Sequence, residues 1–150
     1  MAAGFTVHKD LRDQLIERLS RIADRDLEGL DLRPTLKIDI ELTKDEMTPG
    51  IYPELEKLQP TGMGNPGVIL ALKNTEIADV NIIGKEKNHL RFIVPGAQVS
   101  QAIAFNQAQW YNDWVFRRIR FDLAFTIEIN SFNGKETQQI HIKDMKPSII

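Results

Sequence analysis

FDLAFTIEINSF, at residues 121–132, alternates apolar and polar side chains over its whole length. This period of two is typical of a strand that buries one face and exposes the other. The positions expected in the core are Phe121, Leu123, Phe125, Ile127 and Ile129. The stretch therefore predicts a long strand and favours a β-rich fold.

Further strands are predicted on both sides of this stretch, separated by the short polar turns GKEKN, PGAQ and NGK. They fall near residues 68–73, 76–83, 89–94, 99–105 and 136–145. Five or six strands in about 80 residues favour a small barrel or sandwich. Residues 106–121 interrupt the strands, and we expect them to hold the short helix or loop that separates the third and fourth strands of a five-stranded Greek-key barrel.

The N-terminal part of the chain has a different pattern. Leu11, Leu15, Leu19 and Ile22 recur at helical spacing, which predicts an amphipathic helix over residues 9–24. TLKIDIEL at 35–42 returns to a period of two and predicts a half-buried strand, followed by a short helix. The predicted fold class is α+β, mainly β.

The segment LQPTGMGNPG, at residues 58–67, concentrates three glycines and two prolines. A phosphate-binding P-loop would continue through Gly-Lys-Ser or Gly-Lys-Thr into a helix. Here Asn65, Pro66 and Gly67 lead instead into an apolar, β-branched run. The segment is therefore interpreted as a turn or hinge in preference to a phosphate site.

Composition and charge limit the classes of function. The chain has 150 residues, of which 42% are hydrophobic and 27% charged, as in a soluble folded protein. Cysteine is absent, which excludes disulfides and cysteine-ligated zinc. No apolar run reaches the ~20 residues that span a bilayer, and no signal-peptide pattern opens the chain, so we expect a cytoplasmic protein without a membrane partner.

The charge is unevenly distributed along the chain. Residues 1–66 hold 9 Lys and Arg against 13 Asp and Glu, while residues 67–150 hold 10 against 8. The second part is only mildly basic, so any role in binding nucleic acid depends on where its charges lie.

Six segments together carry a family resemblance: AAGFTV (2–7), KIDIEL (37–42), LQPTGMGNPG (58–67), IADVNIIGKEKNHLRF (77–92), AIAF (102–105) and INSFNGKETQQIHIKDMKP (129–147). In this order they resemble the C-terminal region of RecJ-type single-stranded-DNA-specific exonucleases, which belong to the DHH phosphoesterase family. The GMGNP element and the closing strand-turn-strand with Asn-Gly are the most specific parts.

The resemblance implies a layout of three parts. Residues 1–57 would be the C-terminal part of a DHH-associated domain, a helix-strand-helix remnant. Residues 58–67 would be a glycine/proline hinge, and residues 68–150 a nucleic-acid-binding OB-fold barrel of five to six strands.

The resemblance also implies a function, that of the single-stranded-DNA-binding portion of a 5'-3' exonuclease that acts in DNA repair and recombination. Such enzymes hold Mn or Mg in an N-terminal DHH catalytic domain, which is absent from this chain. His8, His89 and His141 have no ligand-like spacing with carboxylates, so we expect no catalytic residue, metal or cofactor here. The implied partners are single-stranded DNA, the catalytic domain and single-stranded-DNA-binding protein.

The candidate DNA-binding residues follow from the way OB barrels bind. Ligands lie on strands two and three, bordered by the loops between strands one and two and between strands four and five. With residues 76–83 as strand one, these elements supply cations, outward-facing side chains and one aromatic ring. Proteins bind single-stranded nucleic acid with this combination of charge and stacking. Together with an arginine cluster before the long strand, the candidates are Lys85, Lys87, His89, Arg91, Arg117, Arg118, Arg120, Phe132 and Lys135.

Other interpretations of these residues remain open. The lysines are also suited to keeping turns soluble and strand edges unpaired, and Phe132 to covering the barrel end. The arginines could pair with acids of a neighbouring domain, and Trp110, Tyr111 and Trp114 could pack under a loop. The chain would then be a protein-docking module on the catalytic domain or a repair partner.

Overall fold

The structure, a computed structural model, describes residues 4, 6–132 and 134–149. They fall into two compact units, one ending at Thr35 and the other beginning at Leu36.

The first unit contains a short 3-10 helix, η1 (Lys9–Leu11), that runs into helix α1 (Arg12–Leu27). The helix predicted over residues 9–24 is confirmed. Its apolar side chains form a stripe at helical spacing, yet no residue of α1 is buried, and Leu11 and Leu19 are exposed.

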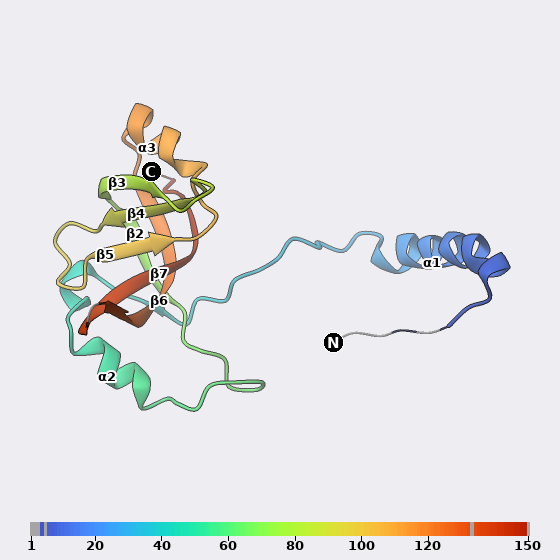
Figure 1. The fold of residues 1–150 in the computed structure, drawn as a ribbon, viewed down its shortest axis with the longest axis horizontal. Coiled ribbons are helices and arrows are strands. Elements are labelled where there is room, and N and C mark those ends of the chain that lie inside the picture. Colours follow the sequence, from blue (N-terminus) through green and yellow to red (C-terminus); the bar gives the residue numbers. More distant parts are fainter. Residues whose placement is uncertain (1–3, 5, 133, 150) are drawn as a thin grey trace. The chain divides into compact units, whose positions relative to one another are not determined.

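The second unit is built on one seven-stranded sheet (Figure 1). Its strands are β1 (Ile40–Glu41), β2 (Leu70–Thr75), β3 (Ala78–Ile83), β4 (His89–Ile93), β5 (Gln101–Ala104), β6 (Phe121–Phe132) and β7 (Lys135–Pro147). Their order in the sheet is β1-β2-β6-β7-β5-β4-β3. Only Glu76 and Ile77 separate β2 from β3, although these strands lie near opposite ends of that order, so the sheet curls back on itself.

The connectivity is that of an OB fold. β2 and β3 act as one bent first strand, since β2 pairs with β6 and β3 pairs with β4, and the register shifts between Leu72 and Thr75. β5 pairs with β7 in parallel, and helix α3 (Trp110–Arg117) connects β5 to β6. Of the short helix or loop expected within residues 106–121, the structure shows the helix. The strands predicted near 68–73 and 76–83 are two halves of a single barrel strand.

The core confirms the alternation in β6 at four of five positions. Phe121, Leu123, Phe125 and Ile127 are buried, and they meet buried residues of β7 and β4. Ile129 is 37% exposed, so its predicted burial is wrong. The reason is geometric: β5 covers β7 only over residues 140–142, and Ile129 lies opposite Gln138, where the β6–β7 hairpin extends past the barrel.

The segment 35–42 differs from its prediction. Only Ile40 and Glu41 form a strand, in parallel with Leu70 and Ala71 of β2. Leu36, Ile38 and Ile40 are 43%, 41% and 45% exposed, whereas Leu42 is partly buried against the core. The predicted half-buried strand is therefore wrong in its length and, except at Leu42, in its burial. The alternation is real, but within the described part of the unit that begins at Leu36 no second layer covers this apolar face.

Two short helices follow this segment. The 3-10 helix η2 (Lys44–Glu46) begins at Thr43 with a capping box, in which the Thr43 N–H donates to the Glu46 carboxylate at 2.7 Å. It delivers Met47 into the barrel core, where the side chain is fully buried. Helix α2 (Ile51–Glu56) is the short helix that the sequence predicts.

The glycine-rich segment 58–67 forms a braced turn. Gly62 and Asn65 exchange backbone hydrogen bonds of 2.8 and 3.1 Å. The Asn65 amide also donates to the carbonyl oxygens of Leu58 and Pro60, at 3.2 and 2.9 Å. Gly64 has a φ of 91°, a conformation that favours glycine. The turn is thus observed, within the unit that begins at Leu36, while a hinge function stays a prediction.

Candidate nucleic-acid interface

The outer face of β4, β5 and β7 carries polar and aromatic side chains. In β4, Leu90 and Phe92 are buried, whereas His89, Arg91 and Ile93 lie on the other face. The outward orientation predicted for His89 and Arg91 is therefore confirmed.

Strand register brings side chains from four strands into one row on this face. Arg91 lies opposite Asn81 of β3 on one side and Ile103 of β5 on the other. Ile103 in turn lies beside His141 of β7. Residues that are distant in the sequence thus form one continuous surface, which we call the β4–β5–β7 face.

Phe105 lies at one end of this face, directly after β5. Its side chain is 47% exposed, although it is a large aromatic group. The ring centroid lies 5.1 Å from that of His89 and 5.8 Å from that of His141, both in edge-to-face geometry. An exposed ring held in place by two neighbouring rings is suited to stacking against a nucleic-acid base.

His89 is held by the loops around it. Its Nδ1 accepts a hydrogen bond from the backbone N–H of Asn106 at 3.0 Å, and the Asn106 side chain accepts one from Asn88 at 2.9 Å. Because Nδ1 is an acceptor, a neutral His89 carries its proton on Nε2, which is then a donor.

Gly84 packs closely against the same imidazole. Its φ is 92°, and a Cβ placed there would lie 3.0 Å from Cδ2 of His89. Gly84→Ala should therefore lower the free energy of unfolding by roughly 1 to 2 kcal/mol through backbone strain. It should also shift the His89 ring resonances. Thermal melting measures the loss of stability, and NMR measures the resonances. Gly134→Ala, at a glycine with φ 73° and open space for a Cβ, is the control: it should destabilise without moving His89. Unchanged His89 resonances in Gly84→Ala would contradict the packing.

His141 lies beside a carboxylate on the same face. Its Nδ1 is 3.1 Å from one oxygen of Glu128, while Nζ of Lys143 is 3.4 Å from the other oxygen. Burial lowers the pKa of His141 and the charge of Lys143 lowers it further, whereas Glu128 acts in the opposite direction. The net effect is a pKa below the usual value, so His141 is mainly neutral at neutral pH.

The loop lysines lie where the sequence places them. Lys85 and Lys87 are exposed in the turn between β3 and β4, and Lys87 has a φ of 53°. Lys135 is exposed at the start of β7, where its backbone pairs with Phe132. The Phe132 side chain lies outside the part that the structure describes. The DNA-binding role of these four residues stays a prediction.

The arginine cluster, Arg117, Arg118 and Arg120, lies at and just after the C-terminal end of α3. Arg117 pairs with Asp113 at 3.5 Å and Arg120 with Glu76 at 3.8 Å, so these arginines meet acids of their own unit. Trp110, Tyr111 and Trp114 are partly buried against the core. The interpretation that these aromatic residues pack inside the fold is confirmed.

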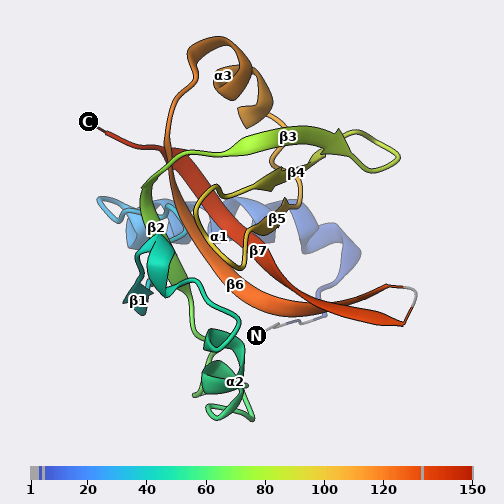
Figure 2. The ribbon, with the colours of Figure 1, turned by 90° about the vertical axis from the view of Figure 1, so that its left-hand side faces the viewer.

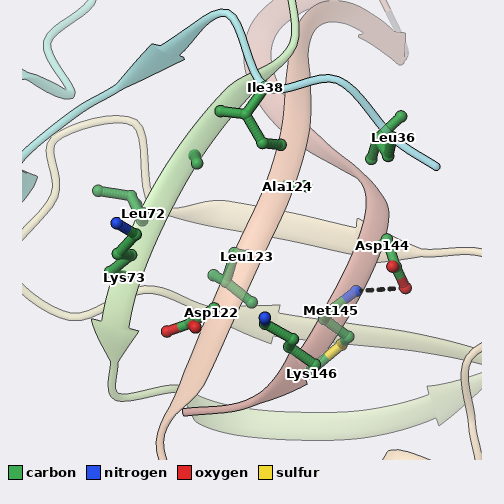
Figure 3. A pocket seen from close by; sticks show the side chains of 11 residues that line it. Leu36, Ile38, Leu72, Lys73, Asp122, Leu123, Ala124, Asp144, Met145 and Lys146 are labelled. Atoms are coloured by element: carbon green, nitrogen blue, oxygen red, sulfur yellow. Dashed lines mark hydrogen bonds between the residues drawn. The ribbon is translucent and has the colours of Figure 1, made fainter. Parts of the chain in front are cut away.

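A separate groove lies on β2, β6 and β7, on the face that points away from the barrel core (Figure 3). It runs over Ala124 of β6 and is flanked by Leu36 and Ile38. Burial raises the pKa of Asp122 there, but hydrogen bonds from the Asn74 N–H and the Ser148 hydroxyl, together with the nearby charges of Lys146 and Lys73, outweigh this effect and lower the pKa. Asp122, and Lys73 through its ion pair with Glu41, are thus engaged in structural contacts, and much of the remaining lining is apolar.

The described part of the chain shows no candidate metal site. Across residues 4, 6–132 and 134–149, no group of three or more His, Asp or Glu side chains is arranged to hold a metal ion. The residues present therefore do not fit Mn or Mg. The helices that the structure describes include none with the length and apolarity of a membrane span.

Sequence reasoning missed Phe105 as a functional candidate. The signal was present, because Ala102 and Ala104 alternate with Gln101 and Ile103, and the same period places Phe105 outward. What the sequence does not contain is the approach of His89, which depends on the antiparallel pairing of β4 with β5, and of His141, which depends on the parallel pairing of β5 with β7.

Comparison with known proteins gives consistent matches. The family described as RecJ OB domain matches residues 38–144. The single-stranded-DNA-specific exonuclease RecJ of Bacillus subtilis is 28% identical over 96% of this chain and 18% of its own length. The protein of that name from Dickeya dadantii is 26% identical, over 98% of this chain and 25% of its own length.

A solved structure gives the same result for the fold. The crystal structure of RecJ in complex with Mn2+ from Thermus thermophilus superimposes with a TM-score of 0.75 at 21% identity. The match covers 98% of this chain and 21% of that chain. The chain thus spans about a fifth to a quarter of the length of the relatives it matches.

Proposed function

Since the chain belongs to the RecJ OB domain family, we propose that it is the single-stranded-DNA-binding portion of a RecJ-type 5'-3' exonuclease of DNA repair and recombination. In this proposal the β4–β5–β7 face holds the strand and guides it to a DHH catalytic domain elsewhere in a longer protein. That domain would hold Mn or Mg. The complete enzyme would act in the cytoplasm, with single-stranded-DNA-binding protein as a further partner.

The observation that carries the proposal is the exposed Phe105 ring between His89 and His141. Stacking of one base on an aromatic side chain contributes about 1 to 3 kcal/mol and tolerates any sequence. Arg91, on the same face, and Lys85 and Lys87, in the adjoining turn, supply positive charge for phosphates. Ring and cations together match the way sequence-tolerant single-strand binders work.

The proposed layout of the chain keeps residues 1–57 as the end of a DHH-associated domain, 58–67 as a hinge and 68–150 as the OB domain. The exposed stripe of α1 supports contact with a further part of such a protein, because apolar stripes of this kind normally pack against something. The exposed Leu36 and Ile38 support the same contact independently.

The proposal predicts a preference for single strands. In a fluorescence-anisotropy titration, the purified chain should bind a single-stranded oligonucleotide more tightly than the duplex of the same sequence. The affinity should fall linearly with salt on a log-log plot, because bound phosphates release counterions. Binding that prefers duplex or ignores salt would instead favour a protein-docking module.

A further inference from the structure

Arg118 terminates α3 in an unusual backbone conformation. Its φ and ψ are 51° and 38°, in the left-handed region, and its N–H donates to the Trp114 carbonyl oxygen at 3.0 Å. Glycine is the residue that most often ends a helix in this way, because any Cβ is disfavoured there. An arginine at this position costs stability, and such costs concentrate at functional sites.

The guanidinium of Arg118 lies on a fixed aromatic ring. Its Cζ is 5.6 Å from the centroid of Trp114, whose indole N–H donates to the Ile77 carbonyl oxygen at 3.0 Å. Stacking of this kind holds a guanidinium in place and leaves its N–H donors available to a phosphate.

The neighbouring arginines are engaged differently. Arg117 and Arg120 form ion pairs, and the guanidinium of Arg120 also donates to the Asn74 carbonyl oxygen at 3.1 Å. Within the described residues, Arg118 forms no ion pair. A cavity of about 260 Å3 opens beside it. Its lining residues are Glu76, Ile77, Trp114, Arg118, Ile119 and Arg120.

Arg118 lies near the start of β3, the strand that pairs with β4 of the β4–β5–β7 face. α3 lies beside β3 (Figure 2), and Ile77, which anchors Trp114, directly precedes that strand. The other end of β3, Ile83, pairs with His89, which contacts Phe105. Ile83 lies six positions after Ile77, so the two are at most about 20 Å apart, and less where the chain bends at Asp79, which has a φ of 49°.

We propose that Arg118, stacked on Trp114, binds a phosphate of a single strand whose bases lie on the β4–β5–β7 face. This rests on the proposed function and extends the DNA path beyond the strands to the end of α3. A trinucleotide stacked on Phe105 spans about 10 Å at about 3.4 Å per nucleotide, and a 12-mer about 40 Å, so we expect the 12-mer to engage both sites and the trinucleotide only the first.

The test compares binding of oligothymidylates of three and twelve nucleotides to wild type, Arg118→Gly, Arg118→Lys and Arg117→Ala. NMR titration follows the trinucleotide and anisotropy the 12-mer. Arg118→Gly should bind the trinucleotide like wild type and the 12-mer about three- to tenfold more weakly. The magnitude of its salt slope should fall by about 0.7.

The control variants make the expectation specific. Arg118→Lys should keep most of the slope, and Arg117→Ala, which removes an ion-paired charge one residue away, should change the affinity less. Because glycine suits the left-handed conformation, Arg118→Gly should melt at or above the wild-type temperature. If it does, weaker binding of this variant cannot be attributed to unfolding.

The possible results separate the two proposals. If the wild type binds neither oligonucleotide, the proposed function fails. If the wild type binds both and Arg118→Gly matches it on the 12-mer, or weakens both lengths equally, the Arg118 site is overturned while the proposed function stands. An equal effect of Arg117→Ala would also overturn the site, because it would reflect overall charge alone.

Discussion

Phe105→Ala should weaken binding of single-stranded DNA by about 1 to 3 kcal/mol, which is roughly 5- to 150-fold in affinity. The ring is the exposed aromatic group on the face that supports the proposed function, and alanine removes the surface on which a base would stack. The slope of log affinity against log salt should change little, because a stacked base releases few counterions. Anisotropy titrations at several salt concentrations measure both quantities.

Two further variants control for effects on the fold. Phe105→Trp keeps an aromatic face and should retain or increase affinity. Ile129→Ala truncates a partly exposed apolar residue on the β6–β7 hairpin and should leave binding unchanged. If Phe105→Ala melts like the wild type and binds DNA normally, the stacking site does not lie at Phe105.

Combined replacement of Lys85, Lys87 and Arg91 should, unlike Phe105→Ala, change the salt dependence of binding. Lys85→Ala, Lys87→Gly and Arg91→Ala together remove three cations, so the magnitude of the salt slope should fall by about 2, because each phosphate neutralised on a single strand accounts for about 0.7. Affinity should fall for all sequences alike. Glycine is used at Lys87 because the φ there is 53°, so the substitution should not destabilise the turn.

The matched control removes the same number of charges from α1. Arg12, Arg18 and Arg25 are exposed on that helix, and their replacement by alanine should leave the slope nearly unchanged. An equal loss of slope in both triple variants would show that net charge, rather than this loop and strand, governs binding.

The sequence predicts most of the barrel because its strands bury one face. β6 has the predicted bounds, and β3, β4 and β7 begin or end within two residues of theirs. The same logic failed for residues 35–42, because alternation marks a face that needs covering without revealing what covers it. Ile129 failed for a related reason, since the sequence does not indicate where neighbouring strands stop.

The sequence predicts less of the candidate site than of the barrel. The outward orientation of Arg91 follows from the period of β4, but the row that it forms with His141 depends on the registers of two strand pairs. The pairing of Arg120 with Glu76 joins residues that are distant in sequence. The local sequence pattern contains neither fact. Only the fold therefore shows that Arg118 lies on Trp114 whereas Arg117 and Arg120 form ion pairs.

The strand pairing described above also has consequences for how fast the protein folds. The β6–β7 hairpin joins neighbours such as Phe132 and Lys135, so it can close early. The contacts of β2 with β6 join Leu70 to Phe125, and the chain between them must lose its freedom before these contacts form. We therefore expect the hairpin to form before the rest of the barrel, and the contact of Phe105 with His141 to form only when β5 pairs with β7.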